Sequence, residues 1–141
     1  MEINQQPITI ERVIKASMEK VWSNWTEPEH IEHWAYAADD WEASDAENDL
    51  RAGGRFKTHM GAKDGSAGFD FGGTYTAVED HKLIEYDLDD GRHVKTVFVE
   101  TPEGVKVTQT FDPEQENPVE KQRAGWQAIL DNFKRYAEAE V

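Results

Sequence analysis

The sequence predicts an α+β fold in which a curved antiparallel sheet of about seven strands wraps around one long C-terminal helix. Three observations support this prediction. β-Branched residues nearly alternate close to the N-terminus, a period of two continues from about residue 41 to 111, and a helical apolar stripe follows near the C-terminus. Short Asp-Gly and Glu-Gly breaks between the central runs are typical of hairpins, which join antiparallel strands.

The N-terminal part predicts a strand followed by a short helix. The strand covers Ile8 to Ala16, where β-branched residues dominate. Ser17 then suits a helix N-cap, and Glu19 places an acid in the first turn, where the helix dipole favours it. Apolar residues follow at the spacing of one helix face: Met18, Val21, Trp22 and Trp25.

A second short helix is predicted directly after the first. Thr26 and Glu29 have the spacing of a capping box, and Pro28 suits the first turn of a helix. Ile31 and Trp34 would form its apolar side. The order so far is strand, helix, helix.

Six further strands are predicted between turn signals rich in glycine, near residues 41–47, 54–61, 68–79, 82–89, 92–100 and 104–112. Alternation places one set of residues on a shared face of the third of these strands: Phe69, Phe71, Gly73, Tyr75 and Ala77. The same argument groups three residues of the next strand: Ile84, Tyr86 and Leu88. Each aromatic residue could be ordinary core or could line a pocket, and a buried phenol needs a partner for its hydroxyl.

The chain closes with a long predicted helix. Asn117 is its expected cap, Pro118 its first residue and Glu120 the acid of a capping box. Apolar residues then form one stripe: Trp126, Ile129, Leu130, Phe133 and Ala137. On the exposed side, Asp131 and Arg135 have the spacing of an ion pair. A curled sheet around a helix with one apolar stripe commonly leaves a gap, and we expect function there.

Composition limits the function classes. The length of 141 residues fits one domain, 1–141, and the 29 acidic against 15 basic residues give a net charge of −14 that repels nucleic acid. The absence of cysteine excludes disulfides, thiolate catalysis and cysteine-type zinc sites. The sequence shows neither the pattern of a signal peptide nor an apolar run long enough to span a membrane. It therefore predicts a cytoplasmic protein without a membrane partner. A monomer and a homodimer both remain open.

Short motifs occur in order along nearly the whole chain, from about residue 8 to 137. They are Val21-Trp22, Trp25-Thr26-x-Pro28-Glu29-x-Ile31-x-x-Trp34, Arg51-x-Gly53-Gly54-Arg55-Phe56, Gly73-Thr74-Tyr75, Leu83-Ile84-x-Tyr86, Val107-Thr108-Gln109-Thr110-Phe111 and Gly125-Trp126-x-x-Ile129-Leu130-x-x-Phe133. This set resembles the proteins related to the activator of the heat-shock protein 90 ATPase, within the START-like, Bet v-like superfamily. The resemblance implies a helix-grip fold with a cavity and no shared catalytic motif.

Three functional hypotheses follow. The first is binding of a small hydrophobic or aromatic molecule between the sheet and the C-terminal helix, with no catalytic residue, cofactor or metal. Its expected ligand-binding residues are Trp34, Phe56, His59, Phe69, Phe71, Tyr75, Tyr86, Trp126, Ile129 and Phe133. The second is an enzyme that resembles the polyketide cyclases, in which a tyrosine or histidine of the pocket would steer the reaction; convergence of His59, Tyr75 and Tyr86 on one point would favour it. The third is a chaperone co-activator-like protein interaction, which an exposed apolar patch would favour.

Four other features have two interpretations each. His59 faces either the cavity, where it could act as an acid or base, or solvent. His30 and His33 have a spacing that can bind a metal, although a surface helix explains it better. Gly125 marks either a close approach beside Trp126 or a frayed first turn. The run of acids between residues 39 and 49 fits a solvated edge strand better than a pair of catalytic carboxylates.

Overall fold

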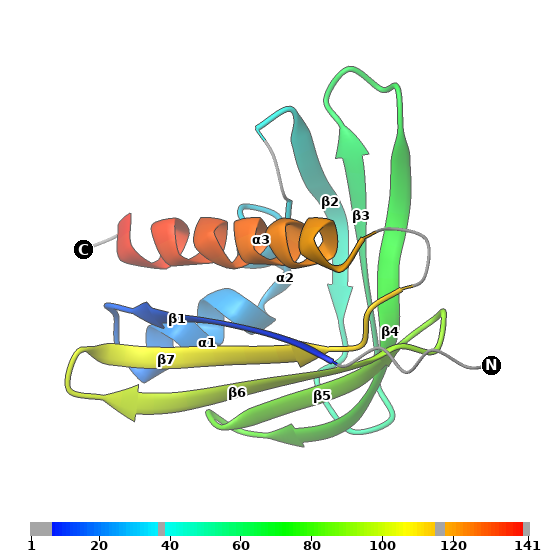
Figure 1. Ribbon diagram of the computed structural model, residues 1–141. Coiled ribbons are helices and arrows are strands. Elements are labelled where there is room, and N and C mark those ends of the chain that lie inside the picture. The colour runs from blue at the N-terminus through cyan, green and yellow to red at the C-terminus, as the bar shows by residue number, and fades with distance from the viewer. Residues whose placement is uncertain (1–6, 37–38, 115–117, 140–141) are drawn as a thin grey trace.

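The computed structural model describes residues 7–36, 39–114 and 118–139, and Figure 1 shows the arrangement of its helices and strands. The elements follow in the order β1 (Ile8–Ile14), α1 (Met18–Thr26), α2 (Pro28–Ile31), β2 (Trp41–Asn48), β3 (Arg55–Ala62), β4 (Gly68–Glu79), β5 (Leu83–Leu88), β6 (His93–Thr101), β7 (Gly104–Phe111) and α3 (Val119–Ala139). One antiparallel sheet has the strand order β1-β7-β6-β5-β4-β3-β2. The predicted α+β fold is therefore confirmed.

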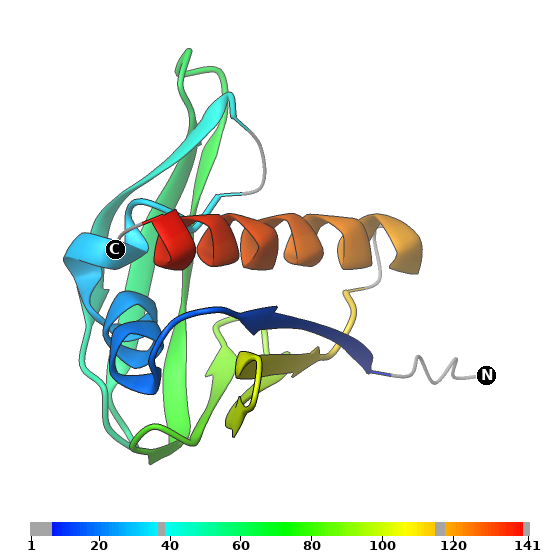
Figure 2. The same cartoon turned by 90° about the vertical axis from the view of Figure 1, so that its left-hand side faces the viewer.

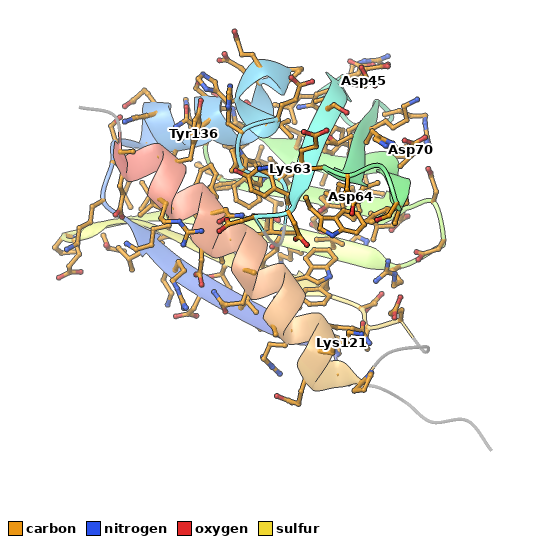
Figure 3. The ribbon with its side chains drawn as sticks, turned by 90° about the horizontal axis from the view of Figure 1, so that it is seen from above. Asp45, Lys63, Asp64, Asp70, Lys121 and Tyr136 are labelled. Atoms are coloured by element: carbon orange, nitrogen blue, oxygen red, sulfur yellow. The ribbon has the colours of Figure 1, made fainter. Side chains whose placement is uncertain are left out.

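Two irregularities accompany the bending of the sheet. The register between β2 and β3 shifts between Ser44 and Glu47, and the register between β4 and β5 shifts between Tyr75 and Ala77. Such bulges bend a strand and increase its twist. Strands β2 to β4 consequently stand across the direction of β6, β7 and β1 (Figure 1) and lie to one side of α3 (Figure 3).

The bulge in β4 also corrects the predicted alternation on that strand. Tyr75 lies opposite Tyr86. The register shifts by one residue between Tyr75 and Ala77, so Ala77 lies opposite Glu85 and Val78 lies opposite Ile84. Ala77 therefore does not share the inner face with Tyr75. An unpaired residue in a bulge reverses the alternation beyond it, and the sequence carries no local sign of this bulge.

Helix α3 uses the predicted apolar stripe to cover the sheet. Leu130, Phe133 and Ala137 are fully buried, whereas Trp126 and Ile129 are partly buried. The cap predicted at Asn117 falls outside the described residues. Among the described helices, α3 included, none combines the length and the apolar character that crossing a membrane requires.

Polar side chains of α3 cover the free edge of β1, which lies directly beneath the helix in two views (Figures 1 and 2). The Lys134 ammonium donates a hydrogen bond to the Val13 carbonyl at 2.8 Å, and Glu138 accepts one from the Lys15 backbone at 2.8 Å. An uncovered edge strand presents unpaired backbone groups that invite aggregation. The helix thus protects this edge of the sheet and is held in place by it.

The ion pair predicted within α3 is replaced by a contact to the sheet. Asp131 lies 2.8 Å from Arg12 of β1, while Arg135 donates a hydrogen bond to Asn132. The i, i+4 spacing permits a pair along one helix, but a cation on the neighbouring strand lies closer. The tertiary contact therefore overrides the local one.

The predicted cap of the second helix is also wrong. The Thr26 hydroxyl donates to the Trp22 carbonyl at 2.8 Å and belongs to the last turn of α1. Glu27 occupies the N-cap of α2 without a side-chain hydrogen bond to the helix. Because α2 ends at Ile31, Trp34 lies beyond it and turns inward, where its indole donates to the Asn24 carbonyl at 2.8 Å.

The outer face of the sheet carries a histidine held between two carboxylates. His93, at the start of β6, shares hydrogen bonds with Asp87 at 2.7 Å through Nδ1 and with Glu85 at 2.8 Å through Nε2. The bond to Asp87, followed by that to Glu85, raises the pKa of His93 above its ordinary value. Both ring nitrogens can donate only in the imidazolium form, which this arrangement therefore favours.

We expect this contact to stabilise the fold more at low pH than at high pH. A raised folded-state pKa stabilises the protein below the pKa of an unfolded histidine, about 6.5, and the contribution is lost as the pH rises through the raised value. The effect is small, because 42% of the His93 side chain is exposed. The difference in Tm between the wild type and His93→Gln should shrink as the pH rises. In a protein that already carries Asp87→Asn and Glu85→Gln, a trend of the same size would contradict this assignment.

Candidate functional site

A cavity of about 510 Å³ lies between the first half of α3 and the concave face of the sheet. Side chains of β3, β4 and β5 form its main wall, α3 forms the opposite wall, and residues from α1, α2 and the turn after α2 close one end. The volume falls within the range of pockets that bind small molecules, about 300–1,000 Å³. This is the gap that a sheet curled around a single helix was expected to leave.

Aromatic rings form much of the cavity surface. The Phe56 ring meets Tyr86 edge-on with centroids 4.7 Å apart, and Phe71 meets Trp126 edge-on at 6.0 Å. Trp126 in turn stacks on Phe111, with centroids 3.9 Å apart and ring planes 10° from parallel. The contacts of Trp126 with Phe71 and Phe111 join α3 to the sheet, and both Trp126 and Phe71 border the cavity.

The two tyrosines of the cavity are in different surroundings. The Tyr75 hydroxyl donates a hydrogen bond to the Asn48 side chain on β2, and Asn48 donates to the Thr26 carbonyl at the end of α1. Burial raises the pKa of Tyr75 well above its ordinary value, so the phenol is neutral. Its hydroxyl therefore links β4, β2 and α1, although its ring lines the cavity.

Tyr86, on β5, is 8% exposed, and burial raises its pKa above the ordinary value. Among the described residues, none forms a hydrogen bond with its hydroxyl. Gln109 of β7 also lines the cavity, and its side chain donates a hydrogen bond to the Thr96 hydroxyl on β6 at 3.3 Å. The sheet therefore offers few polar groups to the cavity, and each of them is positioned by the strand that carries it.

Charged and polar residues gather where α3 begins. Arg92 precedes β6, and Glu114 and Lys121 lie on either side of the connection between β7 and α3. The Gln122 side chain accepts from the Glu114 backbone N–H at 2.8 Å and donates to its carbonyl at 3.1 Å. These bonds fix the connection against the helix, so this end of the cavity has a polar rim.

Most of the residues expected to bind a ligand do line the cavity: Trp34, Phe56, Phe69, Phe71, Tyr75, Tyr86, Trp126 and Ile129. His59 and Phe133 do not. His59 lies on the outer face of β3, 2.9 Å from Asp70, because Thr58 and Met60 take the inner positions on either side of it. Asp70 points away from α3 in Figure 3.

Phe133 belongs to the core, at 0% exposure. Trp25 and Trp34 pack edge-on against its ring with centroids 4.7 and 4.9 Å away. Trp25 and Trp34 border the cavity, so they separate Phe133 from it. One helical stripe therefore changes from cavity wall to core along the length of α3.

The sequence prediction missed several lining residues. Thr58 and Met60 alternate with Phe56 on β3, and this signal would have placed them on the inner face once Phe56 was assigned there. Trp25 and Ile84 were predicted as apolar but were not assigned to the cavity. Arg92 begins a predicted strand, 92–100, but was not assigned to the cavity.

Gly125 borders the cavity within α3. A Cβ atom added to it would meet nothing within 4 Å, so the glycine does not serve a close approach between helix and sheet. The open space beside it is part of the cavity boundary. A side chain at this position would be directed into unoccupied volume.

His30 and His33 pack against α3. His30 Nδ1 shares a hydrogen bond of 2.6 Å with the Tyr136 hydroxyl, and the His33 ring stacks on Tyr136 with centroids 5.5 Å apart. Glu27 and Glu29 lie close enough to His30 for one cation, but both carboxylates are exposed. The packing on Tyr136, labelled in Figure 3, explains both histidines as structural residues.

Comparison with known proteins identifies clear relatives. A family model described as Activator of Hsp90 ATPase homolog 1-like protein matches residues 15–138. A solution structure of the AHSA1-like protein from Aeromonas hydrophila is 49% identical, with a TM-score of 0.90 over 94% of this chain and 92% of that one. The solution structure of Chr148 from Cytophaga hutchinsonii is 50% identical, with a TM-score of 0.81 over the same shares.

A more distant structure shows the fold alone. Protein NE0264 from Nitrosomonas europaea is 21% identical and has a TM-score of 0.84 over 100% of both chains. Among curated proteins, none matches this chain.

Proposed function

The chain belongs to the family of Activator of Hsp90 ATPase homolog 1-like proteins, and from that premise we propose that it binds a small, largely apolar molecule in the cavity between the sheet and α3. The observation that carries this proposal is the cavity itself, about 510 Å³ of space with walls of aromatic rings. Apolar surface of that kind, with a few placed polar groups, is typical of small-molecule sites.

The arrangement does not support a cyclase-like enzyme. Convergence of His59, Tyr75 and Tyr86 on one point would have favoured such an activity, but His59 lies on the outer face of the sheet beside Asp70. The Tyr75 hydroxyl is already bonded to Asn48. Of the three groups, Tyr86 alone has a hydroxyl at the cavity without a partner among the described residues, and a single donor is a binding group and not a catalytic set.

A protein-docking role, suggested by the name of the family, lacks the expected surface. The large hydrophobic side chains of the described residues that are at least half exposed are Phe69, at 51%, and Val99, at 50%. Phe69 lies near the β3–β4 turn and Val99 near the β6–β7 turn, at opposite ends of the sheet (Figure 1). They form no continuous apolar patch of the kind that marks an interface.

Phe69 instead suggests where a ligand enters. It lines the cavity while half of its surface remains exposed, and its ring lies 6.1 Å from that of Trp41 on the edge strand β2. We propose that a ligand passes these rings before it reaches Phe71 and Trp126.

Filling the cavity from Gly125 tests the proposal. We expect Gly125→Leu to weaken binding of the neutral probe N-phenyl-1-naphthylamine at least roughly tenfold, because the new side chain occupies volume that the probe needs. Stability should not fall, since leucine is favoured over glycine in a helix by up to about 1 kcal/mol. Probe fluorescence and urea denaturation measure the two quantities.

Ala124→Leu is the matched control, because Ala124 is the exposed neighbour of Gly125 on the same helix. It should leave probe binding within about twofold of the wild type. Equal binding by both variants and the wild type would contradict a ligand site in the cavity. Native mass spectrometry of the protein as purified then searches for a bound small molecule.

A further inference from the structure

The Tyr86 hydroxyl is a hydrogen-bond donor at the cavity surface without an acceptor among the described residues. The residue is 8% exposed and lines the cavity, and no described residue bonds to its hydroxyl. Most buried polar groups have a protein partner, whereas a hydroxyl that is open to a cavity can bond there to a ligand or to water. Tyr75, its cross-strand neighbour, shows the usual arrangement, with its hydroxyl bonded to Asn48.

Arg92 lies diagonally across from Tyr86 on the same face of the sheet. Tyr86 is paired with Val94 of β6, and Arg92 precedes Val94 by two residues, so alternation directs both to the inner face. The Arg92 Nε atom donates to Asp90 at 2.8 Å. No described residue accepts a hydrogen bond from its terminal Nη groups. The Arg92 charge also acts on Tyr86, whose pKa it lowers against the larger effect of burial.

The two groups together offer hydrogen-bond donors, namely the Tyr86 hydroxyl and the terminal Nη groups of Arg92, while Asp90 accepts only from the Arg92 Nε among the guanidinium nitrogens. A guanidinium matches a carboxylate in shape and charge, and a neutral phenol adds a further donor. We propose that the ligand of this cavity is an apolar molecule with a carboxylate, which Tyr86 and Arg92 bind while its apolar body lies against the aromatic rings. This inference rests on the proposed function and adds the chemical class of the ligand.

Other charges around the cavity have smaller roles in this preference. Lys121, labelled in Figure 3, lies at the first turn of α3 and lines the polar end of the cavity. Glu114 lines that same end, and Glu47 lines the cavity from the edge strand β2. Because acids and bases are both present, their long-range effects oppose each other. The short-range donors of Tyr86 and Arg92 therefore decide which head group is bound.

Three ligands that share one apolar body test the proposal: 6-phenylhexanoate, 6-phenylhexan-1-ol and 6-phenylhexylammonium. Isothermal titration of the wild type should show the carboxylate binding roughly tenfold more tightly than the alcohol, since a hydrogen bond to a charged group contributes more than a neutral one. The ammonium ion should bind most weakly, because it meets donors and a cation. All three measurements use the full chain.

Arg92→Met should remove the preference for the carboxylate, which then binds about as tightly as the alcohol. Tyr86→Phe should weaken the carboxylate by several-fold and leave the fold intact, since no described residue loses a partner. Arg55→Met is the matched control. Arg55 also pairs with an aspartate, Asp89, but it lies on the outer face of β3, so its loss should leave all three affinities unchanged.

The outcomes separate this inference from the proposed function. Tighter binding of the carboxylate that depends on Arg92 and not on Arg55 supports the inference. If the alcohol binds as well as the carboxylate, and Arg92→Met changes neither, the carboxylate site is overturned while the apolar cavity stands. If none of the three ligands binds, both proposals fail.

Discussion

Replacing Phe133 with alanine is expected to lower the free energy of unfolding by about 3–5 kcal/mol, the cost of deleting a large ring from a packed core. Phe133 has no exposed surface, and the rings of Trp25 and Trp34 pack edge-on against it. Its removal leaves a cavity that the surrounding residues would have to move to fill. Urea denaturation, followed by tryptophan fluorescence and far-UV circular dichroism, measures the loss.

Trp126→Ala is the comparison that separates core from cavity on the same helix stripe. Trp126 stacks on Phe111 but borders the cavity, so part of its surface faces space that is already empty. We expect a clearly smaller loss of stability than for Phe133→Ala, together with a larger change in the binding of N-phenyl-1-naphthylamine. Equal losses of stability with unchanged binding would mean that Trp126 is ordinary core.

Tyr75→Phe is expected to lower the free energy of unfolding by about 1–3 kcal/mol, because it leaves the Asn48 side chain without its donor in a partly buried place. The ring stays, so packing hardly changes. Asn48 also holds the end of α1 through the Thr26 carbonyl, and the loss of the Tyr75 hydroxyl therefore loosens the contact between β2 and α1. Thermal and urea denaturation measure the effect.

Tyr86→Phe is the matched control for this prediction, since it also removes one phenolic hydroxyl from the same pair of strands. No described residue depends on the Tyr86 hydroxyl, so stability should barely move. If the two variants lose equal stability, the division of the tyrosines into one that serves the fold and one that faces a ligand is wrong. A stable Tyr75→Phe would likewise contradict the role of the Asn48 contact.

The sequence was sufficient for the elements and their order because the patterns that define them are local. Alternation over strands such as β3 and β7, and the stripe from Trp126 to Ala137, depend on neighbours within one strand or one helix. Boundaries of β2 to β7 were predicted to within one residue, since glycine and aspartate turns mark them. Several aromatic lining residues followed from the same patterns and from the resemblance to the family.

The tertiary structure decided which of the two strand faces points inward. Alternation on β3 separates Phe56 from His59 but is symmetric, so only the position of α3 against the sheet shows that Phe56 lines the cavity and His59 does not. The angle of α3 likewise divides one stripe, with Trp126 at the cavity and Phe133 in the core.

The carboxylate site proposed for Tyr86 and Arg92 depends on the tertiary structure most of all. Tyr86 lies on β5 and Arg92 directly before β6, and the register between these strands makes the two residues diagonal neighbours. The free hydroxyl of Tyr86 is a difference from Tyr75 that arises because Asn48, on the distant strand β2, reaches one phenol and not the other. Hydrogen-bond partners that lie far apart in the chain meet only when the sheet has curled, so no local pattern in the sequence records them.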